Sequence, residues 1–169
     1  MTPEAELELR ARSLEGATVE RVLYQRSERL DDREHAVLHA AFLELAGGRR
    51  MEIGTDDALG SHHGFGLSVR ERRVIDRAFG ELLDVTDTPA WHPHVSKAIT
   101  RSRLAWGDVR SSLRTSLAIG VGIHADWLRR ADYPAALEID TIAGRVTFLA
   151  ARRGEDGIVP FVNALLVTF

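Results

Sequence analysis

Two turns, each lying between a pair of short apolar segments, place the strongest constraint on how this chain can fold. The turns are Gly47-Gly48 and Ala143-Gly144, and they separate residues 35–45 from 49–53 and residues 136–141 from 145–150. Glycine can adopt the positive φ angles of a tight primed turn, so each pair of segments is typical of a β-hairpin. The sequence therefore predicts a fold that is mainly antiparallel β.

The two hairpins lie in parts of the chain that share one order of elements. Each hairpin is preceded by a predicted strand and a charged loop, which spans residues 25–34 in the first case. Each is followed by a polar turn and a final apolar segment. Residues 17–69 and 113–169 are thus interpreted as two similar four-stranded halves, as an internal duplication would produce. Since about 55 residues bury little apolar surface, we expect both halves to share one core in a single domain, residues 1–169.

Helix signals occur in two other segments. Thr2 can cap a helix over residues 3–14, with Pro3 in its first turn. In the connector, residues 70–100, apolar residues from position 74 to position 83 recur at helical spacing. The arginines there alternate with acidic residues, which favours a salt-bridged helix face over a nucleic-acid site; they are Arg70, Arg72, Arg73 and Arg77. We therefore expect an α+β fold with a helical connector packed on the sheets.

Composition excludes several classes of protein. The net charge of −3 lacks the basic excess of nucleic-acid-binding proteins, and the absence of cysteine excludes disulfide scaffolds and thiol chemistry. The longest apolar stretch is shorter than the roughly 20 residues that span a bilayer. The N-terminus does not resemble a signal peptide, which predicts a cytoplasmic location. Lys97 is the one lysine among 22 basic residues, as expected for a bacterium with a GC-rich genome.

Histidine pairs are the candidate metal ligands. His92 and His94 flank Pro93, and on an extended segment this spacing places both imidazoles on one face. His62 and His63 are adjacent, so only one of them would join such a site from a strand. Three ligands with an open position would hold zinc or iron and support hydrolysis. The alternative is that these histidines are solvated loop residues.

Tryptophan and arginine are the candidate binding residues. Aromatic residues beside arginine are frequent anchors of protein interfaces. Trp91 lies in a proline-containing loop, Trp106 is followed by Arg110, and Trp127 precedes two further arginines. The alternative is that each indole covers an end of the core with its N–H hydrogen-bonded.

The sequence contains no nucleophile elbow, P-loop or dinucleotide fingerprint. The leading hypothesis is therefore a non-enzymatic bacterial interaction module without a cofactor, whose partner is another protein. An immunity-type inhibitor of a toxin is one concrete form. The alternatives are a metal-dependent hydrolase that uses the histidines, and a β-barrel with an apolar pocket for a small molecule between its halves.

Overall fold

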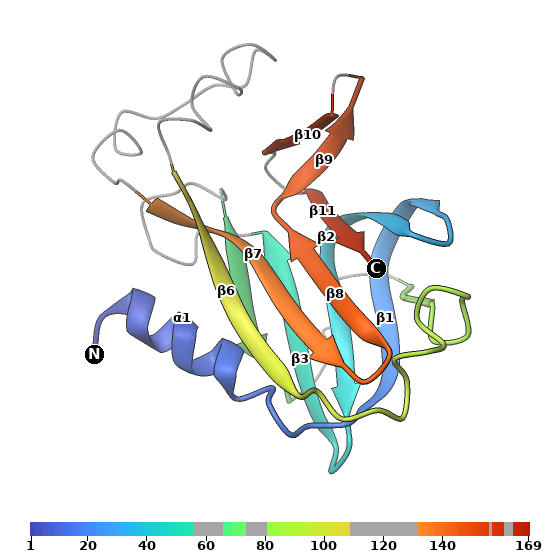
Figure 1. Cartoon of the computed structure of the whole chain (residues 1–169), viewed down its shortest axis with the longest axis horizontal. Coiled ribbons are helices and arrows are strands. Elements are labelled where there is room, and N and C mark those ends of the chain that lie inside the picture. Colours follow the sequence, from blue (N-terminus) through green and yellow to red (C-terminus); the bar gives the residue numbers. More distant parts are fainter. Residues whose placement is uncertain (56–65, 74–80, 109–131, 156, 161–163) are drawn as a thin grey trace.

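The computed structural model describes residues 1–55, 66–73, 81–108, 132–155, 157–160 and 164–169. Within these ranges the chain forms one α-helix and eleven β-strands (Figure 1). In chain order the elements are α1 (Pro3–Arg12), β1 (Val19–Leu30), β2 (Glu34–Leu45), β3 (Arg49–Thr55), β4 (Leu67–Glu71), β5 (Leu83–Asp84), β6 (Arg101–Asp108), β7 (Asp132–Thr141), β8 (Gly144–Leu149), β9 (Ala151–Gly154), β10 (Gly157–Pro160) and β11 (Ala164–Thr168).

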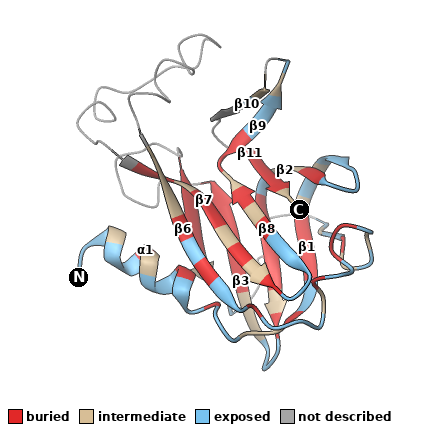
Figure 2. Cartoon of the chain, in the orientation of Figure 1, coloured by how far each residue is buried: buried red, intermediate tan, exposed pale blue. Residues whose placement is uncertain are grey.

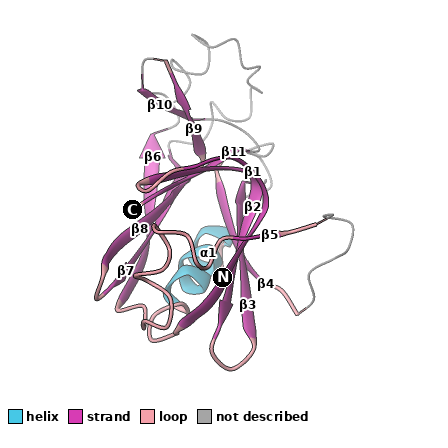
Figure 3. Cartoon of the chain, turned by 90° about the vertical axis from the view of Figure 1, so that its right-hand side faces the viewer, coloured by secondary structure: helices cyan, strands magenta, loops and turns pink. Residues whose placement is uncertain are grey.

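Nine of these strands form one antiparallel sheet, which confirms the mainly antiparallel β prediction. Seven of them follow the order β4-β3-β2-β11-β8-β7-β6, while β1 pairs with β2 and β5. The sheet curls into a half-barrel, so that its two end strands, β4 and β6, come to lie on either side of α1 (Figure 3). β9 and β10 form a separate two-stranded ribbon that projects from the body.

β2 is the strand that joins the two ends of the chain. One of its edges pairs with β1 along nearly the whole strand. The other edge pairs with β11 over residues 34–38 and with β3 over residues 40–45. Between them, His39 has a φ of 69°, a left-handed conformation that is uncommon for any residue other than glycine. This local kink lies where β2 changes partners.

The two predicted hairpins are confirmed. β2 and β3 are joined through Gly47 and Gly48, whose φ angles of 83° and 79° are positive values that favour glycine. β7 and β8 pair across the second turn from Thr141 to Gly144. The internal duplication stays a prediction, because the segment that begins its second half, from residue 113, lies outside the described residues.

The N-terminal helix is also confirmed. Thr2 is its N-cap, and the Thr2 hydroxyl accepts a hydrogen bond from the Ala5 amide at 3.2 Å. Two residues of the helix, Leu7 and Ala11, are buried, and so is Leu14 in the turn that follows the helix. The helix contacts β4 and β6, so its apolar side fills the seam between the two ends of the sheet (Figure 3).

The core lies on the concave face of the sheet. Many residues of the central strands are buried (Figure 2). The largest fully buried side chains are Trp91, Tyr24, Phe42, Phe148, Leu14, Leu43, Leu45, Met51, Ile53, Leu67, Ile99 and Leu137. Apart from Phe42, these residues belong to one continuous cluster shared by strands from both ends of the chain, which gives the described part a common core.

The connector differs from the predicted helix wherever it is described. Residues 70–71 belong to β4, Leu83–Asp84 form β5, and residues 86–96 form successive turns. β5 is extended because it pairs with Leu23 and Tyr24 of β1. The apolar positions between 74 and 80 lie outside the described residues. Nowhere in the described ranges is a helix both long and apolar enough to cross a membrane.

The kink at His39 yields a stability prediction. Its φ of 69° costs an L-residue about 1–2 kcal/mol, and a β-branched side chain tolerates it least. His39→Val is therefore expected to lower the free energy of unfolding by about 1–2 kcal/mol, whereas His39→Gly leaves it nearly unchanged. Urea denaturation checks both, with Arg26→Val at an exposed position of β1 as the control. Equal midpoints for His39→Val and the control would contradict the assigned conformation.

Candidate functional site

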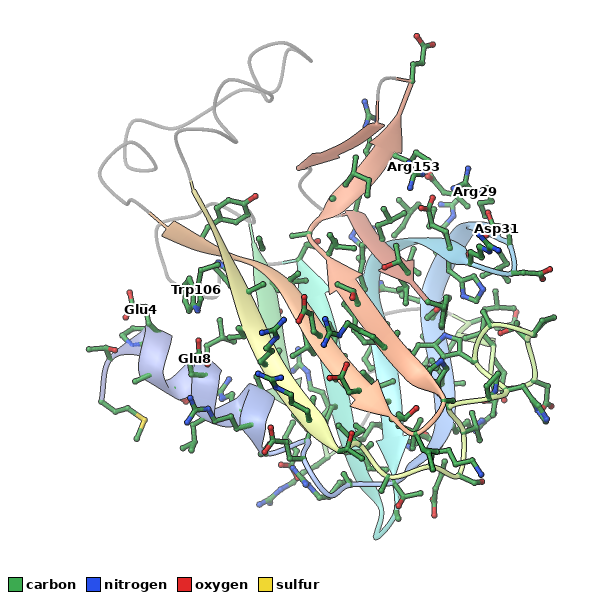
Figure 4. The ribbon with its side chains drawn as sticks, viewed as in Figure 1. Glu4, Glu8, Arg29, Asp31, Trp106 and Arg153 are labelled. Carbon is green, nitrogen blue, oxygen red and sulfur yellow. The ribbon has the colours of Figure 1, made fainter. Side chains whose placement is uncertain are left out.

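The described tryptophans occupy two different environments. Trp91 is fully buried, and its Nε1–H donates a hydrogen bond to the Tyr24 hydroxyl at 2.6 Å. Trp106 is half-buried on β6, and its Nε1–H donates to a carboxylate oxygen of Glu8 on α1 at 2.7 Å (Figure 4). Both indole N–H groups are therefore hydrogen-bonded within the protein. This agrees with the alternative interpretation, in which the tryptophans cover the core and are not interface anchors. Trp127 and Arg110 lie outside the described residues.

Trp91 is held by a tightly turned loop. The His92 amide donates to the Thr88 carbonyl at 2.9 Å, and the Val95 amide donates to the Trp91 carbonyl at 3.2 Å. The Trp91 ring packs edge-on against Phe169, with centroids 5.1 Å apart, and lies 5.9 Å from Phe148. The loop therefore covers the core between β1, β8 and the C-terminus.

A buried chain of hydrogen bonds continues from Trp91. The Tyr24 hydroxyl lies 2.9 Å from Nδ1 of His35 on β2. Because indole N–H is only a donor, Tyr24 accepts from Trp91, and among the described residues His35 Nδ1 is the acceptor for its own proton. We therefore assign His35 as the neutral tautomer protonated at Nε2. Burial lowers the pKa of His35, partly offset by a backbone hydrogen bond with Asp31, and burial raises the pKa of Tyr24.

The His-x-His pair does not have the extended geometry on which the metal hypothesis depends. His94 is buried, its Nδ1 lies 2.8 Å from the Thr141 hydroxyl, and burial lowers its pKa. His92 is exposed on the turned loop. His62 and His63 lie outside the described residues. In the ranges that the structure describes, no three His, Asp or Glu side chains are grouped so as to hold a metal ion.

An ion-pair cluster ties the β9–β10 ribbon to the body. The Glu34 carboxylate accepts hydrogen bonds from Arg153 of β9, one of them from Nε at 2.8 Å, and from the Arg29 guanidinium. Asp31 caps the β1–β2 turn, because its Oδ1 accepts from the Glu34 amide at 2.7 Å (Figure 4). Arg153 holds the pKa of Glu34 below its usual value, although burial opposes this. Glu34 therefore connects the β9–β10 ribbon to the β1–β2 hairpin through these ion pairs.

The described surface is hollowed where α1 runs beside β4. A smaller hollow, with a volume of about 130 Å³, is lined by Pro3, Glu6, Leu7, Arg10, Ser68, Val69 and Arg70. A larger one, about 460 Å³, is lined by Arg10, Ser13, Met51, Arg70, Glu71 and Arg72. Arg10 and Arg70 line both hollows, so the two are neighbours, and together we call them the α1–β4 groove.

Hydrogen-bond donors dominate the α1–β4 groove. Arg10 donates to the Val69 carbonyl at 3.4 Å and to Glu6 one helical turn before it. Arg72 donates to Glu52 at 2.5 Å. Ser68 is 1% exposed, and its hydroxyl has no hydrogen-bond partner in the part of the chain that is described. Three guanidinium groups, those of Arg10, Arg70 and Arg72, make the groove suited to donating hydrogen bonds to ligand oxygens.

The sequence prediction missed this groove because it placed the arginines on a helix. β4 pairs with β3 as far as Glu71, and the Arg72 amide donates to the Arg50 carbonyl at 2.8 Å. The sequence did predict a strand at the end of residues 17–69, and the structure continues it to Glu71, as the alternation of apolar and polar residues from Leu67 to Arg70 indicates.

Comparisons with models of known protein families, with curated proteins and with solved structures found no match. Function is therefore inferred from the geometry of this chain's own residues.

Two histidines that are buried in the described part of the chain yield a pH prediction. Burial lowers the pKa of His35 and His94 below the usual 6.5, so the unfolded chain binds their protons at a higher pH than the folded chain does. The free energy of unfolding should therefore fall as the pH drops below about 6.5, by at most about 1.4 kcal/mol per pH unit for each histidine. Urea denaturation between pH 7.5 and 5 measures this loss.

Variants assign the effect to particular residues. His35→Gln should flatten the pH profile, although it also lowers stability at pH 7.5 because the Tyr24 hydrogen bond changes. His92→Gln, at an exposed position, is the control and should keep the wild-type profile. A His35→Gln profile as steep as that of the wild type would contradict the assignment.

Proposed function

We propose that this protein is a non-enzymatic interaction module that binds another protein through the α1–β4 groove. The observation that carries the proposal is the convergence of Arg10, Arg70 and Arg72 from two elements on one groove. Arginine is enriched at protein interfaces, because its planar guanidinium binds carboxylates through two parallel hydrogen bonds. The groove is therefore suited to a partner that presents acidic side chains.

The packing of the sheet supports binding at the surface. Large side chains from both ends of the chain, among them Trp91, Phe148 and Met51, fill the concave face that a small-molecule barrel would leave open. Trp91 and His94 are likewise engaged inside the protein, by Tyr24 and Thr141. The groove differs from these sites because its donors line the surface.

We expect the acidic side chains of the partner to contact arginines that already form ion pairs within the protein. Arg72 is bound to Glu52, and Arg49 lies 3.5 Å from Glu71 beside the groove. The Arg49–Glu71 pair is exposed, and such surface pairs contribute about 0–1 kcal/mol, so an acidic partner can rearrange it at small cost. Glu52 is only 7% exposed, so Arg72 is expected to keep its pair with Glu52 while it contacts the partner. An inhibitor that covers a toxin is one form that fits this mode of binding, and it needs neither a metal nor a cofactor.

The product of the adjacent gene in the native genome is the first partner to test, since immunity proteins are encoded beside their toxins. The double variant Arg70→Glu, Arg72→Glu reverses two charges in the groove and should weaken its binding at least tenfold, which corresponds to about 1.4 kcal/mol. Isothermal titration calorimetry measures the affinity at two salt concentrations, because ion pairs weaken as salt rises.

The matched control is Arg26→Glu, which makes the same charge change at an exposed position of β1. It should bind like the wild type. If the double variant and the control bind the partner equally well, the groove is not the docking surface. Thermal unfolding of all three proteins shows whether a loss of binding reflects a loss of folding.

A further inference from the structure

We infer that the loop of residues 86–96, which we call the flap, is sensitive to acid: it stays closed while His35 and His94 are neutral and opens when they bind protons. The flap lies beside β1 and Phe169 (Figure 1). It shares no residue with the α1–β4 groove, so the inference is independent of the proposed docking surface.

The flap is bonded within itself and is joined to the sheet backbone at its ends. Turn hydrogen bonds connect residues 88–95 to one another. Directly before the flap, the Val85 amide donates to the Val22 carbonyl at 3.0 Å, and at its far end the Ser96 amide donates to the Val19 carbonyl at 2.7 Å. Among the described residues, no backbone hydrogen bond joins the flap to the sheet between these two points. Such a segment can open locally, at a smaller cost than global unfolding.

Two side chains of the flap, Trp91 and His94, hold it closed. Trp91 Nε1–H donates to the Tyr24 hydroxyl at 2.6 Å, and His94 Nδ1 lies 2.8 Å from the Thr141 hydroxyl. Both rings also pack against the ring of Phe169, whose centroid is 5.1 Å from that of Trp91 and 6.1 Å from that of His94. All these partners lie outside the flap, so loss of their contacts would free it between its two ends.

His35 acts on the Trp91 contact through Tyr24. The Tyr24 hydroxyl donates to neutral His35 at Nδ1 while it accepts from Trp91. A proton on Nδ1 would make this nitrogen a donor, and the buried Tyr24 proton would then lack an acceptor among the described residues. The imidazolium itself would be 1% exposed. Buried charges and unpaired polar groups are both costly, so protonation favours the open flap, in which water reaches them.

His94 responds to acid in the same way. It is buried, and its hydrogen-bond partner Thr141 is neutral, so a proton on His94 would also place an uncompensated charge in the core. Burial lowers its pKa. Among the described charged groups, Asp31 is the one that raises the pKa of His35, and burial outweighs its effect. Both anchors of the flap are therefore weakened by the same fall in pH.

The pH range follows from the direction of these shifts. In the open flap both imidazoles reach water and have the ordinary pKa of about 6.5, whereas the closed flap holds both pKa values below 6.5. The closed form is therefore most stable above about pH 6.5 and loses stability as the pH falls below it. Between pH 7.5 and 5, each histidine shifts the equilibrium toward the open form by at most about 30-fold.

Hydrogen exchange of the Trp91 indole N–H, followed by NMR in the full chain, measures the opening. After correction for the intrinsic exchange rate, its protection should fall at least tenfold between pH 7.5 and 5. At pH 5 it should also be at least tenfold less protected than the Phe42 amide of β2. Addition of 1 M urea should change it little, because local opening exposes little surface. Equal protection of the two N–H groups at pH 5 would overturn the inference, since it would show that only global unfolding releases Trp91.

Variants assign the response to the two histidines. His35→Gln and His94→Gln each remove one titrating group, so each should reduce the loss of Trp91 protection between pH 7.5 and 5 at least threefold. His92→Gln, at an exposed position of the same flap, is the control and should respond like the wild type. His94→Gln keeps the test decisive where His35→Gln is too unstable to measure. A loss of protection that His94→Gln leaves unchanged, or that His92→Gln reduces equally, would overturn the inference.

Discussion

The fold depends on how the unpaired backbone groups of the two end strands of the curled sheet, β4 and β6, are covered. An open sheet exposes unpaired backbone groups at both edges, and these promote aggregation unless they are covered. Here α1 and the segment after it lie against both ends. Arg10 donates to the Val69 carbonyl of β4, and the Ser102 amide of β6 donates to Glu15 at 3.0 Å. A helix of only ten residues thereby closes the described part of the sheet.

The same seam explains where the candidate site lies. α1 is mostly polar, and beside Leu7 and Ala11 it carries charged residues that do not enter the core. Arg10, one of these residues, reaches the Val69 carbonyl of β4 and lines the α1–β4 groove together with Arg70. At its far end β4 approaches β7 so closely that a Cβ at Gly66 would lie 3.1 Å from Pro134. The groove is therefore a consequence of how the sheet closes.

Local signals in the sequence predicted part of this architecture. Thr2 and Pro3 mark the start of α1, and Gly47 and Gly48 mark the turn between β2 and β3, because capping and turn formation depend on few neighbouring residues. The charged segment from residue 25 was expected to be a loop, yet β1 continues to Leu30. Pairing with β2 stabilises the strand there, and Arg26 points into solvent.

Long-range contacts determine the rest, and no local pattern encodes them. β6 was not predicted, since its sequence is mostly charged or small and becomes a strand through its pairing with β7. The burial of Trp91 depends on Tyr24, which is 67 residues away in the chain. The arginines at positions 70 and 72 reach the groove only because the strand containing Arg70 ends beside α1.

Native-state hydrogen exchange of the Ser102 amide tests most directly whether α1 closes the sheet. This amide belongs to an end strand and is bonded to Glu15, which lies in the turn after α1. If α1 and its flanking segment are an integral part of the fold, Ser102 should exchange within about tenfold of the rate of Phe42 in the central strand β2, as expected when both open by global unfolding. Exchange of Ser102 a thousand times faster than that of Phe42 would contradict the account, because it would show that the seam opens on its own.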